Sequence, residues 1–467
     1  MSYNNEKLNE FNDYIRYRKV AIIGLGVSNI PLLDYLYNKK ANITIFDERE
    51  YNQIPRDIVE KITNYGFMIH FGKDCLQHLK NFNVIFRSPS CLPTKPELVE
   101  EANRGALVTT EVELLMQMCP AKVIGVTGSD GKTTTTSLIN SILQKAGYKT
   151  FLGGNIGTPL FTRLSEITPE DIVVLELSSF QLMGMEVSPQ IAVITNITPN
   201  HLNIHKDYQE YIDAKKNIFK YQDENGILVL NYDNEITKEC AKEANGKVIF
   251  FSSQTKLDNG YIVDEDVIKE CDDKVRKHIL NTDDVILRGN HNYQNIATAI
   301  AATASLVDIE TAVKAIKEFR PVEHRIEFVE EIDGVKWYND SASSSPSRTL
   351  SGINAFKERI VLIAGGYDKN LDYAPLAKPI VDKVKTLILI GQTAGKIYEV
   401  VKSELEKENK DLDIYMCETL EETISIARKN ANSGDVVLFS PASASFDMFK
   451  NFADRGNQFK NLVRNLK

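Results

Sequence analysis

Apolar segments rich in valine and isoleucine recur along the chain and predict its strands. Continuous apolar strands that alternate with helical patterns, such as SLINSILQKAG here, are typical of parallel sheets covered on both faces. The segments show no alternation of polar and apolar positions, so we expect doubly wound α/β sheets. Those of the first half lie at 20–24, 43–47, 123–128, 172–178 and 191–197.

The same pattern returns late in the chain, at 360–366, 386–391 and 436–441. Each of these segments is followed by a turn with glycine or serine and then by a helical pattern, which predicts a third α/β unit. The segment 232–288 is charged and weakly periodic, and we interpret it as a peripheral extension of the middle unit.

Two composition breaks suggest the domain boundaries. One lies near 110–120, where TTEVELLMQMCPA leads into a new strand, and the other near 320, where Pro321 interrupts a helical pattern. We therefore expect three domains. They comprise residues 1–115, 116–320 and 321–467.

Composition narrows the class of protein. The 467 residues, with 43% hydrophobic and 25% charged side chains, are those of an ordinary folded protein with several domains. A net charge of -9 without a basic run gives no electrostatic footprint for nucleic acid or an anionic membrane. The sequence shows neither a signal peptide nor an apolar stretch of about 18 residues, so we expect a cytosolic protein. The six cysteines form no C-x-x-C pair and are expected to be reduced, buried thiols.

The strongest chemical signal is VIGVTGSDGKTTTTSLI, a strand that runs through a glycine-rich turn into a helix beginning near Thr133. Backbone N–H groups of such a loop and the positive end of the helix bind phosphates. Lys132 would reach the terminal phosphates and the Thr133 hydroxyl would meet Mg²⁺, which predicts an ATP site. The spacing departs by one position from G-x-x-x-x-G-K-T, because residue 126 is valine.

A second turn, GLGVSN at 24–29, follows the first strand, and Asp47 ends the next one. This arrangement resembles the dinucleotide fingerprint, with Asn29 in place of the third glycine. On these residues alone, three interpretations stay open: a nicotinamide site, a site for another nucleotide, and a tight turn without a ligand.

Several further blocks give the chain a resemblance to a known family, the Mur ligases, from about residue 18 to the end. The blocks occur in the family's order. They are TGSDGKTTT, LELSSFQL at 175–182, NITPNHLNIH at 196–205, YIDAKKNIF at 211–219, NHNYQNIATA at 290–299, EHRIEF at 323–328, NDS at 339–341 and SPASASFDMFKNFADRGNQF at 440–459.

The resemblance implies three mainly parallel, doubly wound domains: a Rossmann-like N-terminal domain for the UDP-linked substrate, a central P-loop ATPase-like domain, and a Rossmann-like C-terminal domain for the amino acid. It also implies a monomeric, ATP-dependent amide ligase of peptidoglycan precursor synthesis. The expected substrates are UDP-N-acetylmuramoyl-L-alanine and D-glutamate, joined through an acyl phosphate. A nicotinamide site is thereby excluded.

The family match gives roles to individual residues. Lys132, His201 and Lys215 are the expected catalytic residues, with Lys215 reacting with CO₂ to form a carbamate. Periodicity alone would place Lys215, beside Lys216, on a solvated helix face, and would make His201 an ordinary surface histidine. Glu176 ends a buried strand, where a lone carboxylate is costly without a cation. The expected Mg²⁺ set is Thr133, Glu176, His201 and Lys215.

The remaining matches concern the nucleotide and the substrates. For Asn292 and Asn295, which we expect just before an apolar helix, helix capping is the alternative interpretation. The expected ATP contacts are Gly128, Ser129, Asp130, Gly131, Lys132, Thr133, Thr134, Asn292, Asn295, Arg325 and Asp340. The expected contacts to the uridine nucleotide are Val27, Ser28, Asp47, Arg49, Ser88 and Pro89, and the expected contact to the muramoyl group is Asn155. The expected contacts to D-glutamate are Ser344, Lys369, Ser445 and Phe452.

The chain departs from the family pattern in two blocks. NHLNIH has Asn200, Asn203 and Ile204 where the family has two carboxylates and an arginine, and DSASSS has Ala342 where the family has a lysine. Two rival functions follow: another ligase of the superfamily, such as a folylpolyglutamate synthetase or a Mur ligase for a different amino acid, and a nucleotide-binding regulator without turnover. Retention of Lys132, Glu176, His201 and Lys215 favours an active ligase.

Overall fold

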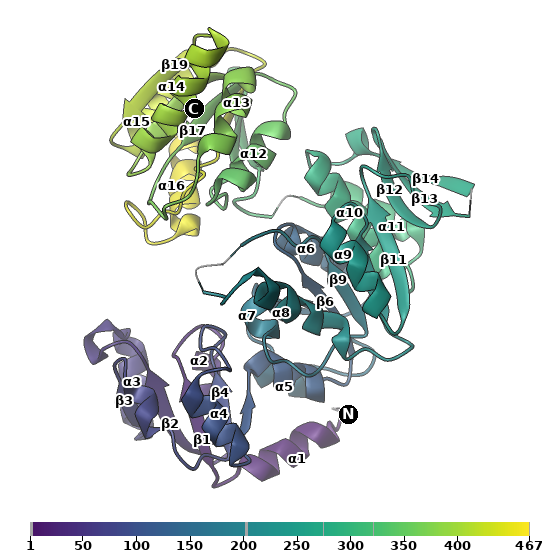
Figure 1. The fold of residues 1–467 in the computed structure, drawn as a ribbon, viewed down its shortest axis with the longest axis vertical. Coiled ribbons are helices and arrows are strands. Elements are labelled where there is room, and N and C mark those ends of the chain that lie inside the picture. The colour runs from purple at the N-terminus through teal and green to yellow at the C-terminus, as the bar shows by residue number, and fades with distance from the viewer. Residues whose placement is uncertain (1–2, 201–203, 274, 321, 467) are drawn as a thin grey trace. The chain divides into compact units, whose positions relative to one another are not determined.

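The computed structural model describes residues 3–200, 204–273, 275–320 and 322–466. These residues form three β-sheets in chain order, each with helices around it (Figure 1). The chain divides into two compact units. The first comprises Met1–Asn281 and Gln294–Ile316, and the second Thr282–Tyr293 and Lys317–Lys467.

The N-terminal sheet has five parallel strands in the order β3-β2-β1-β4-β5. Both faces of its central strand β1 are buried: Val20 and Ile22 pack with one set of helices, and Ala21 and Ile23 pack with another cluster. The elements are β1 (Lys19–Ile23), α2 (Ile30–Asn38), β2 (Asn42–Asp47), α3 (Arg56–Tyr65), β3 (Met68–Phe71), β4 (Val84–Arg87), α4 (Pro96–Asn103) and β5 (Leu107–Thr109).

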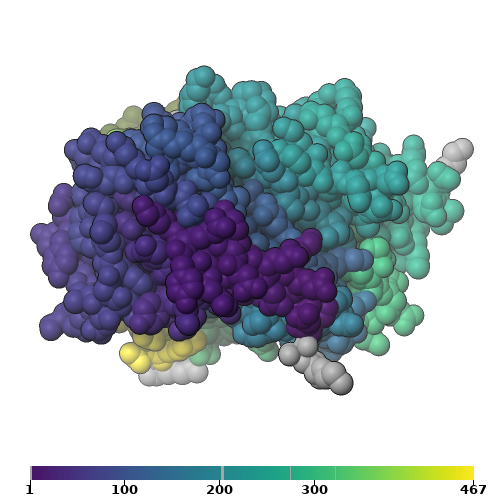
Figure 2. Space-filling model, turned by 90° about the horizontal axis from the view of Figure 1, so that it is seen from below, coloured from purple at the N-terminus to yellow at the C-terminus, as the bar shows by residue number. Residues whose placement is uncertain are grey.

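An amphipathic helix, α1 (Glu6–Ile15), precedes this sheet. Its buried residues are Leu8, Phe11 and Ile15, and the Phe11 ring meets the rings of Phe86 in β4 and Phe161 in η3 (Phe161–Glu166) edge-on. Figure 2 shows the N-terminal segment, in purple, lying on the surface of the first unit. Helix α1 therefore contacts both the N-terminal sheet and the middle part of the chain.

The middle sheet has nine strands in the order β14-β13-β12-β11-β10-β9-β6-β8-β7. The seven strands β12-β11-β10-β9-β6-β8-β7 pair in parallel, and β13 and β14 continue the sheet antiparallel at the β12 edge. Strands β12, β13 and β14 of the charged segment 232–288 form that edge, and β11 of the same segment pairs beside it. The elements are β6 (Lys122–Thr127), α6 (Lys132–Lys145), β7 (Thr150–Gly154), β8 (Ile172–Glu176), α7 (Ser179–Leu182), β9 (Ile191–Ile194), α8 (Tyr208–Lys220), β10 (Ile227–Asn231), α9 (Glu235–Cys240), β11 (Lys247–Ser252), β12 (Gly260–Asp264), β13 (Val267–Asp272), β14 (Val275–Asn281), α10 (Asn290–Thr303) and α11 (Ile309–Glu318).

The third sheet has six strands in the order β15-β16-β20-β17-β18-β19, parallel except for the β15–β16 pair. Alternate residues of β17 face different helices, because Leu362 packs with α13 and α14 while Ile363 packs with α15 and α16. The elements are β15 (Glu327–Ile332), β16 (Val335–Asn339), α12 (Pro346–Asn354), β17 (Ile360–Ala364), α13 (Ala374–Lys383), β18 (Val384–Ile390), α14 (Ala394–Glu408), β19 (Asp413–Cys417), α15 (Leu420–Asn430), β20 (Val436–Phe439) and α16 (Phe452–Arg464).

The predicted architecture of three mainly parallel α/β sheets is confirmed. The predicted boundary at residue 115 falls inside α5 (Glu111–Met118), and the boundary positions stay predictions. The six cysteines are free thiols, four of them buried. Within the part of the chain that the structure describes, no helix has the length and apolar character needed to cross a membrane.

Candidate active site

The phosphate loop connects the buried end of β6 to the first turn of α6, which begins at Lys132. Gly131 has a φ of 81°, and a Cβ there would lie 2.5 Å from Oδ1 of Asn295, so this position needs glycine for both conformation and space. Ser129 donates from Oγ to the carbonyl of Thr198, at 2.9 Å. The loop thus leads directly to the N-terminus of α6, where backbone N–H groups favour anions.

Two lysines converge on one carbonyl of this loop. Lys132 Nζ donates to the carbonyl oxygens of Gly128, at 2.8 Å, and Ser129, at 3.0 Å. Lys215 Nζ, from α8, donates to the same Gly128 oxygen at 2.9 Å. The structure therefore brings together Lys132 and Lys215, which are far apart in the sequence, at the position where phosphates are expected.

The environment of Lys215 favours the neutral amine. The residue is only 1% exposed. Burial and the nearby charge of Lys132 lower the pKa of Lys215 well below its usual value, although Asp130 and Glu176 oppose the shift. A neutral amine is the form that reacts with CO₂, so the lowered pKa of Lys215 favours carbamate formation.

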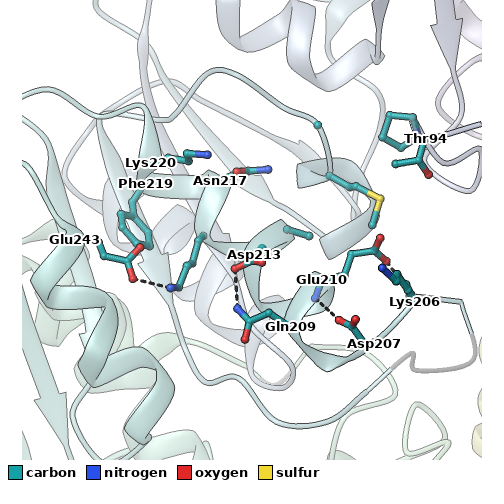
Figure 3. A pocket seen from close by; sticks show the side chains of 15 residues that line it. Thr94, Lys206, Asp207, Gln209, Glu210, Asp213, Asn217, Phe219, Lys220 and Glu243 are labelled. Carbon is teal, nitrogen blue, oxygen red and sulfur yellow. Dashed lines mark hydrogen bonds and ion pairs between the residues drawn. The ribbon is translucent and has the colours of Figure 1, made fainter. Parts of the chain in front are cut away.

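Lys216 points to the opposite side of α8. Its Nζ lies 2.6 Å from Oε1 of Glu243, and its side chain is 22% exposed. Lys216 and Glu243 line a pocket of about 670 Å³ along this outer face of the helix, together with Asp213 and Lys220 (Figure 3). The solvated-face interpretation therefore holds for Lys216 and is wrong for Lys215.

Glu176 has one carboxylate oxygen available for a cation. It is 2% exposed at the end of β8; Oε1 accepts a hydrogen bond from Asn155 Nδ2 at 2.7 Å, and Oε2 accepts none from any described residue. A buried carboxylate oxygen without a donor is costly unless a cation meets it. The charge of Glu176 also acts on Lys215, and its unpaired carboxylate oxygen is the type of ligand that Mg²⁺ binds.

The other loop residues take defined places. The backbone N–H of Asp130 donates to Asn196 Oδ1 at 3.0 Å, and Thr134 is buried. Thr133 follows Lys132 in the first turn of α6, as expected for a hydroxyl that meets a phosphate-bound cation. The predicted metal ligand His201, with Asn203, lies outside the described residues.

Asn292 and Asn295, two of the predicted ATP contacts, lie inside α10, so the helix-capping interpretation is wrong. The helix begins at Asn290, earlier than the apolar pattern of the sequence predicts. Asn295 Oδ1 accepts from Thr135 Oγ1 at 3.2 Å, which places this side chain against the phosphate loop. Asn292 Nδ2 instead donates to the carbonyl of Arg288 at 2.7 Å.

The GLGVSN turn encloses a cavity of about 310 Å³ lined by Asp47, Arg49 and Ser88. Asp47 accepts from the Leu25 N–H at 2.8 Å and from Arg49. These hydrogen bonds outweigh burial and lower the pKa of Asp47. Three of the predicted uridine-nucleotide contacts are thus together. Val27, Ser28 and Pro89 are not among the residues that line the cavity.

Asn29 explains how the turn forms without a third glycine. Its side chain is fully buried, and Nδ2 donates to the carbonyls of Ile23, at 2.9 Å, and Gly24, at 3.0 Å. Gly24 has a φ of 84°, and a Cβ there would lie 2.7 Å from Ser88 Oγ. Asparagine therefore ties the turn to the strand end where the dinucleotide fingerprint has glycine.

In the second unit, Asp340 is a buried carboxylate with three donors. It accepts hydrogen bonds from Ser343 Oγ at 2.6 Å, Ser440 Oγ at 2.7 Å and the Ile326 N–H at 3.2 Å. Burial raises the pKa of Asp340 to about 6, although the hydrogen bonds and Arg325 oppose the shift. The charge of Arg325 thus acts on Asp340, and their role as ATP contacts stays a prediction.

Arg455 of α16, which sequence reasoning did not single out, binds the backbone next to two of the predicted amino-acid contacts. This guanidinium is 2% exposed and donates to the carbonyls of Ser341, Ser443 and Ala444. Burial lowers the pKa of Arg455 to about 10. Arg455 therefore holds the two loops that carry the predicted contacts Ser344 and Ser445. The feature of the sequence that could have identified Arg455 is its place in the block SPASASFDMFKNFADRGNQF.

The two remaining predicted contacts are more accessible. Phe452 is 48% exposed, and its ring meets His324 edge-on with a centroid distance of 6.0 Å. Lys369 Nζ lies 5.8 Å from the centre of the Phe446 ring. Ala342, where the family has a lysine, is buried and donates its backbone N–H to the carbonyl of His324.

Fold and site together define a phosphate-loop, nucleotide-binding α/β protein. Three family models match the chain in order: "Mur ligase MurD-like, N-terminal domain" at residues 18–110, "Mur ligase middle domain" at 126–303 and "Mur ligase, glutamate ligase domain" at 324–443. The chain belongs to the Mur ligase family, and as a member it uses ATP.

Curated relatives cover the chain from end to end. The UDP-N-acetylmuramoylalanine--D-glutamate ligase of Acetivibrio thermocellus is 47% identical over 464 residues, which are 99% of this chain and 99% of the relative. The enzyme of the same name from Clostridium tetani is also 47% identical over 464 residues, covering 99% of this chain and all of the relative. The motifs on which the resemblance rests therefore belong to a full-length match.

Solved structures share the fold at lower identity. MurF from Acinetobacter baumannii aligns with a TM-score of 0.61 at 15% identity, covering 100% of this chain and 99% of that chain. The UDP-N-acetylmuramate-alanine ligase MurC from Thermotoga maritima aligns with a TM-score of 0.60 at 18% identity, covering 96% of this chain and 100% of that chain. These likenesses support the three-sheet fold.

Proposed function

We propose that this chain joins the amine of D-glutamate to the alanyl carboxylate of UDP-N-acetylmuramoyl-L-alanine, with ATP converted to ADP and phosphate. The full-length match to the D-glutamate ligases carries the substrate assignment. The pair of lysines on Gly128 O supports phosphoryl transfer at this loop. The product is a precursor of peptidoglycan, and the enzyme acts as a monomer.

The reaction has two steps. In the first, the substrate carboxylate attacks the γ-phosphorus of ATP, so that an acyl phosphate forms and ADP leaves. In the second, the amine of D-glutamate attacks the acyl carbon, a C–N bond forms, the C–O bond to phosphate breaks, and the amine loses a proton. Lys132 neutralises charge on the transferring phosphoryl group from its place at the α6 N-terminus.

The buried acidic and basic groups of the middle domain prepare this site for Mg²⁺. Thr133, Glu176, His201 and carbamylated Lys215 hold the cation, and bound Mg²⁺ neutralises charge on the phosphates. Lys215 contributes because its neutral amine can attack CO₂ and lose a proton, which converts a buried neutral amine into a buried anion. The oxygen of Glu176 that accepts no hydrogen bond from a described residue supports this assignment.

Binding of the other reactants uses the two Rossmann-like domains. The cavity lined by Asp47, Arg49 and Ser88 holds the uridine nucleotide, and Asn155 contacts the muramoyl group. The loops held by Arg455, with Lys369 and Phe452, hold D-glutamate. Arg325 and Asp340 of the C-terminal domain are matched to ATP contacts.

One assay separates this proposal from its rivals. Phosphate release is measured with Mg-ATP, UDP-N-acetylmuramoyl-L-alanine and D-glutamate, and each component is left out in turn. We expect release only with the complete mixture, and product of the mass of the ligated dipeptide. Turnover with another amine in place of D-glutamate would indicate a different ligase, and nucleotide binding without turnover would indicate a regulator.

A further inference from the structure

The buried imidazole of His205 connects two elements of the middle domain. It lies before α8, and its side chain has no exposed surface. Nε2 lies 3.0 Å from Oγ of Ser179, the first residue of α7. Nδ1 lies 3.3 Å from Oε2 of Glu210, on the first turn of α8, at an ion-pair distance without the alignment of a hydrogen bond. The ring is thus held between α7 and α8.

The two contacts have complementary polarity. Glu210 Oε2 also accepts the backbone N–H of Lys206 at 2.8 Å, and Figure 3 shows Glu210 beside Lys206 at the start of α8. A carboxylate next to Nδ1 favours the tautomer with the proton on that nitrogen. Nε2 is then an acceptor for the Ser179 hydroxyl, while Nδ1 faces the Glu210 carboxylate at ion-pair distance.

Aromatic contacts extend this connection to the phosphate loop. The His205 ring stacks on Phe180, with centroids 4.9 Å apart and planes at 9°, and meets the Tyr211 ring edge-on. Tyr211 reaches Ser129 of the loop through an Oη–Oγ contact of 2.9 Å. Its ring also lies 4.7 Å from Lys215 Nζ. Tyr211 therefore connects His205 to both the phosphate loop and Lys215.

We infer that His205 is a positioning residue that fixes α7 relative to α8, and with them Glu176 relative to Lys215. Glu176 ends the strand just before α7, and Lys215 lies on α8, so the contact spans the two elements that must meet one cation. Groups behind metal ligands set ligand orientation, and their loss typically weakens metal affinity by 10- to 100-fold. The inference rests on the proposed function, which places one cation between Glu176 and Lys215.

The test measures Mn²⁺ binding by electron paramagnetic resonance in the presence of a non-hydrolysable ATP analogue. His205→Phe keeps a ring for stacking on Phe180 but removes both polar contacts, and Ser179→Ala removes one contact without changing the ring. We expect Mn²⁺ affinity to fall 10- to 100-fold in His205→Phe and less in Ser179→Ala. His205→Gln, which can still bond to Ser179, should recover part of the loss. Lys216→Ala, on the outer face of α8, is the matched control and should bind Mn²⁺ as the wild type does.

Kinetics add a second readout. We expect kcat of the same variants to fall while the KM for UDP-N-acetylmuramoyl-L-alanine stays unchanged, because the contacts of His205 among the described residues lie on α7 and α8 and not at the cavity lined by Asp47, Arg49 and Ser88. Unchanged Mn²⁺ affinity in both His205→Phe and Ser179→Ala would overturn the inference. The inference would also be overturned if the variants lost thermal stability, bound Mn²⁺ more weakly and showed a raised KM in parallel. Since Mn²⁺ binding needs neither D-glutamate nor the UDP substrate, it decides the role of His205 even where the ligase assay fails.

Discussion

Lys132 and Lys215 donate to the same oxygen, the carbonyl of Gly128, at 2.8 and 2.9 Å. Two cations that share one acceptor in a buried site repel each other, and the more buried of them loses its proton more easily. The charge of Lys132 accordingly contributes to the lowered pKa of Lys215, after burial itself. One lysine can therefore serve as a fixed charge while the other serves as an amine.

Lys132→Ala should abolish ligation and leave the fold intact. The change removes a charge from an anion site and no atoms from a core, and loss of such a contact costs at least about 10²-fold in rate. Phosphate release measures the activity, and circular dichroism checks the fold. Near-normal turnover in a folded variant would reject the phosphate-loop assignment.

Lys215→Ala should be nearly inactive, because the buried carbamate cannot form. A small carboxylate such as formate or acetate should restore part of the turnover by occupying the place of the carbamate. The adjacent Lys216→Ala is a matched control with nearly normal activity, since that side chain pairs with Glu243 on the outer face. Full activity of Lys215→Ala, or a wild-type protein without added mass on Lys215, would argue against the carbamate.

Lys369→Ala should mainly raise the KM for D-glutamate. Loss of a charge-assisted hydrogen bond of about 1.5 to 3 kcal/mol corresponds, at its upper limit, to a rise in this KM of roughly 10²-fold. The effect on ATP should be smaller. Lys407→Ala, in which the lost lysine pairs with Glu404 on α14, serves as the control in the same steady-state assay. An unchanged KM for D-glutamate would remove Lys369 from the pocket.

Phe11→Ala should destabilise the first unit, because its ring packs against Phe86 and Phe161. Truncation of a buried phenylalanine typically costs about 3 to 5 kcal/mol. Urea unfolding measures the change, and Glu10→Ala on the exposed face of α1 should have little effect. If Phe11→Ala and Glu10→Ala unfold at the same urea concentration, α1 does not contribute to the stability of this unit.

Glu111 should make stability depend on pH. Burial raises the pKa of Glu111 from 4.5 to about 7, although the N–H groups of Phe161 and Leu160 oppose the shift. The unfolded chain therefore ionises first, and stability falls as pH rises from about 4.5 to about 7, by roughly 3 kcal/mol at the limit. Glu111→Gln keeps an acceptor for the Phe161 N–H without the charge. We expect the variant to be more stable than the wild type at pH 8 and to lose this advantage at pH 4.5, as followed by urea unfolding. An equal pH dependence in both proteins would contradict the assignment.

The sequence by itself determined the strands and the phosphate loop, because both depend on local properties. Runs of valine and isoleucine without polar positions form buried parallel strands whatever their partners, and glycines before Lys132 produce the loop by their backbone freedom. The place of Glu176 at a strand end followed from the same pattern.

The tertiary structure alone decided which polar groups are buried and what they contact. Lys215 and Lys216 are adjacent and chemically alike, and only the packing of α8 against the phosphate loop buries the first and exposes the second. Asn295 meets Thr135 for the same reason, although their separation in sequence hides the contact. Arg455 and His205 hold loops through carbonyl, hydroxyl and ring contacts that no local pattern encodes, because such contacts form only after distant segments pack together.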